Sequence, residues 1–152
     1  MKRQLIAVAG IGAALFLVGG ALAHGPGPKH PGAGRVIQVK ASGQTTIWIL
    51  HVARGCHSWS DGKQVGETAR VTMQRGSRLM IVNQDIDGHT LIQTSGPRIA
   101  LRVQMMMGHG TAVTFRQSGN YRFRTKTFEM PGMGDMKTIG PDHELMLVVQ
   151  VS

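Results

Sequence analysis

Apolar and polar residues alternate along most of the chain from Arg35 onward, in short runs separated by glycine-containing turns. A period of two residues is typical of a β-strand with one buried face, and no window shows a sustained helical period. The predicted strands cover 36–40, 45–53, 70–74, 78–83, 89–94, 99–103, 111–116, 121–126 and 144–151.

This succession of short strands predicts an all-β domain over 35–152. Many short strands with Gly-rich turns are typical of an antiparallel Greek-key sandwich or barrel. The segment 129–142 is the longest irregular stretch inside the domain and contains Met, Gly and Pro residues. Because long loops on such folds commonly carry function, this segment is a candidate functional loop.

The N-terminus has the pattern of a secretory signal peptide over 1–23. Lys2 and Arg3 precede an uncharged stretch, and Ala21-Leu22-Ala23 is a small-x-small cleavage signal. An uncleaved anchor is the alternative, because the uncharged stretch just reaches spanning length. Residues 24–34 are rich in Gly and Pro and predict a flexible leader. We expect an exported protein, periplasmic or extracellular, with no stable membrane insertion after cleavage.

The composition limits the kinds of site and partner that the chain can have. The chain has one Cys, ten Met and seven His, and its 17 Lys and Arg against eight Asp and Glu give a net charge of +9. A single Cys excludes an intrachain disulfide, and an unpaired thiol in an exported protein is expected to be buried, metal-bound or paired with another chain. So few aromatics argue against nucleic-acid binding. Without a nucleophile motif or an acid pair, we do not expect an enzyme.

Several motifs together resemble the cupredoxin family, which has the blue-copper fold. The stretch 76–96 resembles that family's strand, Asn-containing turn and first His ligand. The stretch 119–123, Gly-Asn-Tyr-Arg-Phe, resembles the Gly-x-Tyr-x-Phe strand that leads into the family's ligand loop, and a Met- and Gly-containing loop then precedes a final apolar strand. The resemblance implies a cupredoxin-like sandwich that binds copper, with His89 in the position of the first copper-binding His.

The chain departs from the family where the remaining ligands would stand. Thr125 occupies the position of the family's Cys, and no His follows until His143. The single Cys, Cys56, lies far upstream in a Cys-His-x-Trp stretch, which resembles a group of exported cupredoxin-like proteins with an early Cys. The standard ligand set is therefore absent from its usual loop.

Cys56 and the nearby imidazoles are the alternative ligands, because thiolate and imidazole together bind copper or zinc strongly. In a regular strand Cys56 and His57 would point to opposite faces, so both bind one ion only if Gly55 permits a loop there. We predict Cys56 and His89 as core ligands, with His57 or His51 as the third. The other interpretation is that Cys56 is a buried core residue and His57 caps a turn.

Two groups of methionines could supply thioether ligands, which select copper(I). Met130 or Met133 would be a weak fourth ligand from the loop, in a cluster that also contains Met136. The run 105–107 is the second group. For both groups the alternative is that Met fills gaps in the core.

A basic stripe runs along one face of the predicted strand 121–126, formed by Arg122, Arg124 and Lys126. It is either a solvated outer face or a docking surface for an acidic redox partner or an anionic membrane.

The sequence therefore favours an exported copper-binding protein that transfers one electron through a mononuclear Cys/His site. One alternative is a cell-envelope copper(I) carrier or buffer that uses the Met-rich segments. The other is a metal-free β-sandwich that serves as a binding module.

Overall fold

The computed structural model describes residues 34–53, 56–99, 101–128 and 144–152. Every regular element in these ranges is a β-strand, and none of the described residues forms a helix long and apolar enough to cross a membrane. The predicted signal peptide over 1–23 and residues 24–33 of the predicted leader over 24–34 lie outside the described residues. The strands are β1 (Val36–Ala41), β2 (Gln44–Ala53), β3 (Cys56–Ser60), β4 (Val65–Gly66), β5 (Thr68–Met73), β6 (Arg78–Gln84), β7 (Gly88–Ser95), β8 (Arg102–Met105), β9 (Gly110–Thr114), β10 (Gly119–Phe128) and β11 (Glu144–Val151).

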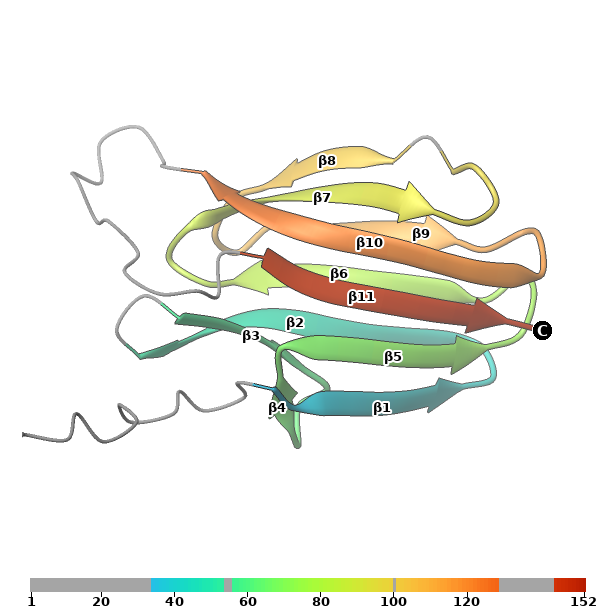
Figure 1. Ribbon diagram of the computed structural model, residues 1–152, viewed down its shortest axis with the longest axis horizontal. Helices are drawn as coiled ribbons and strands as arrows, with labels where there is room; N and C mark the ends of the chain where they lie inside the picture. Colours follow the sequence, from blue (N-terminus) through green and yellow to red (C-terminus); the bar gives the residue numbers. More distant parts are fainter. Residues whose placement is uncertain (1–33, 54–55, 100, 129–143) are drawn as a thin grey trace, which may run out of the picture.

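The strands form two sheets that face each other (Figure 1). The six-stranded sheet has the order β1-β5-β11-β10-β7-β8, and the five-stranded sheet has the order β4-β3-β2-β6-β9. Strands that follow one another in the chain often lie in different sheets, as β1 and β2 do. The all-β sandwich predicted from the alternation is therefore confirmed.

The pairing within the sheets is mixed, whereas the sequence predicted antiparallel strands. β5 lies parallel to both β1 and β11, and β2 lies parallel to β6. Antiparallel partners can be joined by a short turn, but parallel partners need a crossover connection. Here the crossovers are made by passing through the opposite sheet, which alternation along one strand cannot reveal.

Most predicted strands agree with the observed ones, and the differences have a physical reason. The sequence missed β3 because its inward side chains are His57 and Trp59, so it shows no run of apolar residues. It also missed the two-residue β4. The strand predicted at 99–103 begins at Arg102, where it pairs with β7.

The core lies between the sheets and consists of side chains from alternate strand positions. Tyr121 and Phe123 of β10 both pack against Phe115, with ring centroids 4.8 and 6.3 Å apart and edge-on geometry. The Tyr121 hydroxyl donates a hydrogen bond of 2.7 Å to the Gln117 carbonyl, so its polar end is satisfied. Each fully buried side chain of this size contributes roughly 1.5–3 kcal/mol. The buried apolar set is Ile37, Ile47, Ile49, Trp59, Ala69, Val71, Met73, Leu79, Ile81, Leu91, Met105, Val113, Phe115, Tyr121, Phe123, Leu145, Leu147, Val149 and Val151.

The inward positions change from apolar to polar at one end of the sandwich. Along β2 the inward series Ile47, Ile49 continues to His51, and along β6 the apolar inward positions lead to Asn83 and then Asp85. At this end β10 stops and β11 starts, on the left in Figure 1. The same alternation that builds the core therefore delivers polar side chains to this end.

Gly110 of β9 lies where the backbone of β6 approaches closely. A Cβ there would lie 2.6 Å from the Ile81 carbonyl oxygen and 3.2 Å from the Val82 Cα. We expect Gly110→Ala to lower the free energy of unfolding by about 1–3 kcal/mol, because backbone atoms must move to admit the methyl group. Denaturant unfolding measures the change. Gly43→Ala is the matched control, since nothing lies within 4 Å of its added Cβ, and an equal loss in both variants would contradict the argument.

Candidate metal centre

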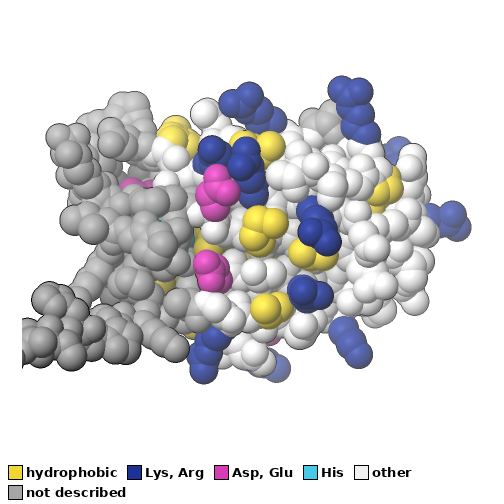
Figure 2. All heavy atoms as spheres, viewed as in Figure 1, with side chains coloured by type: hydrophobic (Ala, Val, Ile, Leu, Met, Phe, Trp, Pro, Cys, Tyr) yellow, Lys and Arg dark blue, Asp and Glu magenta, His cyan; other side chains and the backbone are white. Residues whose placement is uncertain are grey.

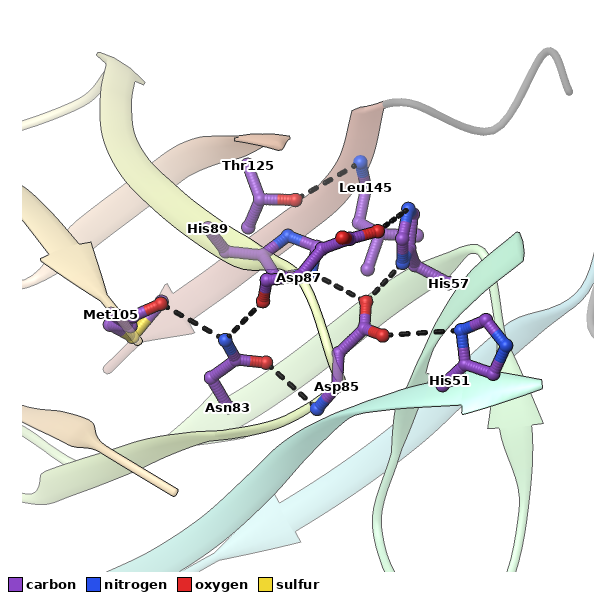
Figure 3. A network of polar contacts seen from close by, with 9 residues as sticks. All are labelled: His51, His57, Asn83, Asp85, Asp87, His89, Met105, Thr125 and Leu145. Atoms are coloured by element: carbon purple, nitrogen blue, oxygen red, sulfur yellow. Dashed lines mark hydrogen bonds and ion pairs between the residues drawn. The ribbon is translucent and has the colours of Figure 1, made fainter. Parts of the chain in front are cut away.

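Three imidazoles converge on one carboxylate at the polar end of the sandwich (Figure 3). His51 comes from the end of β2, His57 from β3 and His89 from the start of β7. The carboxylate belongs to Asp85, in the turn between β6 and β7. The cluster therefore joins segments from both sheets.

The contacts within this cluster are short. Oδ2 of Asp85 contacts Nδ1 of His57 and lies 2.8 Å from Nε2 of His89. Oδ1 of Asp85 lies 3.3 Å from Nδ1 of His51. The rings of His57 and His89 pack edge-on, with centroids 4.9 Å apart. One carboxylate oxygen thus contacts two imidazoles, and the other oxygen faces the third.

Strand register explains why His51 and His57 meet. The two residues are direct partners in the antiparallel β2–β3 pair, so their side chains share one face of the sheet. A register shift follows between His51 and Ala53, where the hairpin leaves regular pairing. Both imidazoles therefore lie on the face of the sheet that also carries the buried Ile49–Trp59 pair, with His57 buried and His51 exposed at its end.

Asn83 fixes the turn that carries the carboxylate. Its side-chain Oδ1 accepts a hydrogen bond of 2.9 Å from the Asp85 N–H. Its Nδ2 donates to the Asp87 carbonyl at 2.8 Å and to the Met105 carbonyl at 2.9 Å. These bonds tie the β6–β7 turn to the end of β8, which sets the direction of the Asp85 side chain.

Asp85 is completely buried, as are His57 and His89 to within 2%. Burial alone would raise the pKa of the Asp85 carboxyl, because it disfavours the charged form. The hydrogen bonds from His57 and His89, and their charge, outweigh burial and hold this pKa well below its ordinary value of 3.8. The carboxyl is therefore an anion at neutral pH.

Four buried polar atoms around this anion have no hydrogen-bond partner among the described residues: His57 Nε2, His89 Nδ1, Asp85 Oδ1 and Asp87 Oδ2. His57 Nε2 and Asp87 Oδ2 lie 3.9 Å apart, too far for a hydrogen bond. Nε2 of His57 and Nδ1 of His89 are the ring nitrogens that do not contact Asp85, and an imidazole nitrogen without a proton offers its lone pair to a ligand. Buried polar groups are rarely left unsatisfied, so this cluster has the character of a site for a further ligand.

His51, His57 and Asp85 could hold a metal ion, because their donor atoms all lie within 4.8 Å of one another. His51 is the exposed member, which gives an ion access from solvent. Two imidazole nitrogens and a carboxylate oxygen are suited to copper(II), nickel, zinc or iron. The copper that the family resemblance implies therefore fits these residues in its divalent state.

The structure brings together three of the predicted ligands, His51, His57 and His89. His89 donates to Asp85 rather than joining the three-residue group, so it acts as a support for the carboxylate in this arrangement. Cys56 begins β3 and its backbone pairs with Ala53, but its side chain lies outside the described residues. Its role as a thiolate ligand stays a prediction.

The predicted thioether ligands Met130 and Met133, with Met136, lie in 129–143, outside the described residues. β10 ends and β11 begins at the cluster's end of the sandwich, and Thr127 at the end of β10 pairs with His89. The run 105–107 does not form one group. Met105 is 1% exposed in the core, whereas Met106 and Met107 are 38% and 49% exposed.

Asp85 is the site residue that the sequence does not single out, because Asp is common in turns between strands. Its signal is the alternation of β6 continued beyond the strand. Leu79 and Ile81 point inward, and steps of two residues lead to Asn83 and Asp85. A polar residue at the end of an inward apolar series is thus a candidate site residue.

Comparisons with known proteins give structural likeness only. No protein-family model matches the chain. No curated protein matches it either. Among solved structures, a purple cupredoxin from Nitrosopumilus maritimus is 16% identical with a TM-score of 0.46, over 71% of this chain and 99% of that one. Rusticyanin from Thiobacillus ferrooxidans is 12% identical with a TM-score of 0.41, over 76% of this chain and 82% of that one.

A copper-containing nitrite reductase from Thermus scotoductus is 13% identical with a TM-score of 0.42, over 75% of this chain. The chain spans only 28% of that enzyme. Cupredoxins thus recur among the matches, and they are the family that the sequence motifs resemble. At these scores the likeness carries no argument about function, and the sandwich fold is established by the two sheets themselves.

Asp85→Asn tests the electrostatic role of the cluster in metal-free protein. The amide has no negative charge to strengthen the hydrogen bonds from His57 and His89, so we expect the free energy of unfolding to fall by about 1–3 kcal/mol. Because the folded pKa is depressed, this contribution is present above pH 3.8 and is lost as the pH falls below that value. Denaturant unfolding with a chelator present, from neutral to acid pH, measures the difference.

Asp87→Asn is the control for that variant, because Asp87 lies in the same turn without a close hydrogen bond to an imidazole. We expect it to cost less than Asp85→Asn. A difference between wild type and Asp85→Asn that does not shrink on acidification would contradict the assignment of Asp85 as the central anion.

Proposed function

We propose that the protein is an exported copper-binding protein that holds one copper ion at the polar end of the sandwich and exchanges single electrons through it. The observation that carries the proposal is the convergence of His51, His57 and Asp85 within 4.8 Å. Export is supported by the signal-peptide pattern over 1–23.

Copper(II) is the ion that this donor set favours. Affinities of nitrogen and oxygen sites for divalent metals rise along the first transition series to a maximum at copper(II). His51 and His57 supply nitrogen and Asp85 supplies a negatively charged oxygen, while the orphaned ring nitrogens leave further capacity for coordination. His89 would not bind the ion itself. Its hydrogen bond to Asp85 would orient the carboxylate, as hydrogen-bond partners of metal ligands commonly do.

Single-electron exchange is the part of the proposal that depends on Cys56. A thiolate beside imidazoles allows copper to cycle between its two oxidation states. Cys56 directly precedes His57, and its backbone lies one pair beyond the His51–His57 pair. The register shifts at this point of the hairpin, with the extra residue on β2, and such a bulge bends the strands next to a site. This bend would let Cys56 approach the ion that His57 binds.

Copper binding is tested by titrating metal-free protein with copper(II) against a competing chelator, with electron paramagnetic resonance to detect nitrogen ligands. We expect one equivalent to bind, and Asp85→Asn and His57→Gln each to weaken binding by at least about tenfold. His109→Gln and Asp61→Asn are the matched controls, because both residues lie outside the cluster in turns. Unchanged affinity in Asp85→Asn would overturn the proposed site.

The electron-transfer part has a separate readout. If Cys56 is a ligand, the copper(II) protein shows a thiolate-to-copper absorption band in the visible region, and Cys56→Ser abolishes that band while copper binding persists. A colourless wild-type copper(II) protein would remove electron transfer through a Cys/His site from the proposal and leave a nitrogen–oxygen copper centre.

The copper(I) carrier is the second candidate, and its support is narrower. Met106 and Met107 are exposed side by side in the turn between β8 and β9, next to His109. Thioethers there would be accessible to copper(I) from solvent. Copper(I) binding that survives Cys56→Ser and Asp85→Asn but is lost on Met→Leu changes would favour this function.

A further inference from the structure

We infer that the outer face of the six-stranded sheet is a docking surface for an acidic partner protein. We call this surface the basic face. It consists of the outward side chains of all six strands of that sheet, β1, β5, β7, β8, β10 and β11. The inference does not depend on the metal site, because none of its residues belongs to the cluster around Asp85.

Positive charge is concentrated on this face. The outward positions of its strands hold six basic residues, Lys40, Arg70, Arg102, Arg122, Arg124 and Lys126. Glu144 is the only acidic residue in the six described strands of this sheet. The five-stranded sheet is different, since its described strands hold a single Lys or Arg, which is Arg78. The basic stripe predicted on β10 is therefore part of a larger basic surface, which covers the six-stranded sheet and not the five-stranded one.

Strand register places the basic residues around an apolar centre. Arg70, Val148 and Arg122 lie in one row across β5, β11 and β10. The next row crosses β11, β10, β7 and β8 in that order. It consists of Met146, Arg124, Ile92 and Arg102. Figure 2 shows this face, with apolar side chains visible between the basic ones.

Most of these charges are not neutralised within the described chain. Glu144 pairs with Arg124 at 3.3 Å and with Lys126 at 3.5 Å. Among the described residues no acidic side chain pairs with Arg70, Arg102 or Arg122. Glu67, just before β5, already accepts a hydrogen bond of 2.7 Å from the Gly34 N–H. An acidic surface would therefore gain unshared cationic partners here.

A shallow pocket lies on the basic face, at the end opposite the Asp85 cluster. The pocket has a volume of about 300 Å³. Its lining residues are Gln93, Thr94, Ser95, Gly96, Arg98, Leu101 and Arg102. Arg98 and Arg102 place two guanidinium groups around it, and a guanidinium can bind a carboxylate through two hydrogen bonds. A protruding Asp or Glu of a partner is the group that fits this chemistry.

The shape of the face favours a protein over an anionic membrane. Membrane-binding surfaces project apolar and aromatic side chains past their charges into the lipid. Here Ile92, Met146 and Val148 are half-buried between longer basic side chains. The one aromatic residue at an outward position of the six described strands is Phe128, at the end of β10, and it is half-buried against Gly88 instead of projecting outward. Four of the six basic residues are Arg, which is enriched in protein interfaces. A recessed apolar centre with an Arg rim matches a protein surface of opposite charge.

The test compares two variants with equal net charge. The face variant is Arg70→Glu/Arg102→Glu/Arg122→Glu, which leaves the ion pairs of Glu144 intact. The control is Arg75→Glu/Arg78→Glu/Arg116→Glu, which reverses three exposed arginines away from the face. The probe is a glutamate–tyrosine copolymer, which combines carboxylates with apolar groups. Binding is measured by calorimetry at low and moderate salt, and contacts are mapped by amide chemical shifts.

We expect the wild type and the control to bind within about threefold of each other, and the face variant to bind at least about tenfold more weakly. Shifted amides should lie in β5, β7, β8, β10 and β11, and affinity should fall as salt is added. Equal weakening in both variants would overturn the inference, since only net charge would then matter. Binding to phosphatidylglycerol vesicles without binding to the copolymer would overturn it too, in favour of a membrane surface.

Discussion

A buried negative charge at the end of an apolar core is the constraint on which the functional end of this protein depends. Removing a carboxylate from water is costly, and the charge persists only where donors replace the lost water. Asp85 receives them from His57 and His89, with His51 at its open side. These contacts fix the orientation of the His57 and His89 rings, and the second nitrogen of each ring is left without a hydrogen-bond partner among the described residues.

The alternation of apolar and polar residues was sufficient to predict the fold class and most strands, because burial of one face imposes a period of two residues. It could not predict which strands pair. β2 and β6 are parallel neighbours separated by strands of both sheets. Such contacts depend on crossovers between sheets, which leave no periodic signal. β3 was missed for a related reason, since its inward residues are partly polar.

The site could be predicted in part. His51, His57 and His89 stood out as imidazoles near a Cys or at a family position, and the structure brings all three together. The residue that unites them was missed, because Asp in a turn is common and its direction depends on the bonds made by Asn83. Those bonds reach Met105, far along the chain, and only the folded structure reveals them.

Asn83 also determines which parts of the protein are free to change. Its backbone accepts from the Gly108 N–H and donates to the His109 carbonyl, while its side chain holds the turn. The position of the carboxylate is thus set by β6 and the end of β8. None of the side-chain hydrogen bonds of Asn83 comes from β2 or β3, the strands that carry His51 and His57. The anion is therefore anchored from one side of the cluster, and exchanging an imidazole on the β2–β3 hairpin changes what the anion faces without removing the bonds that position it.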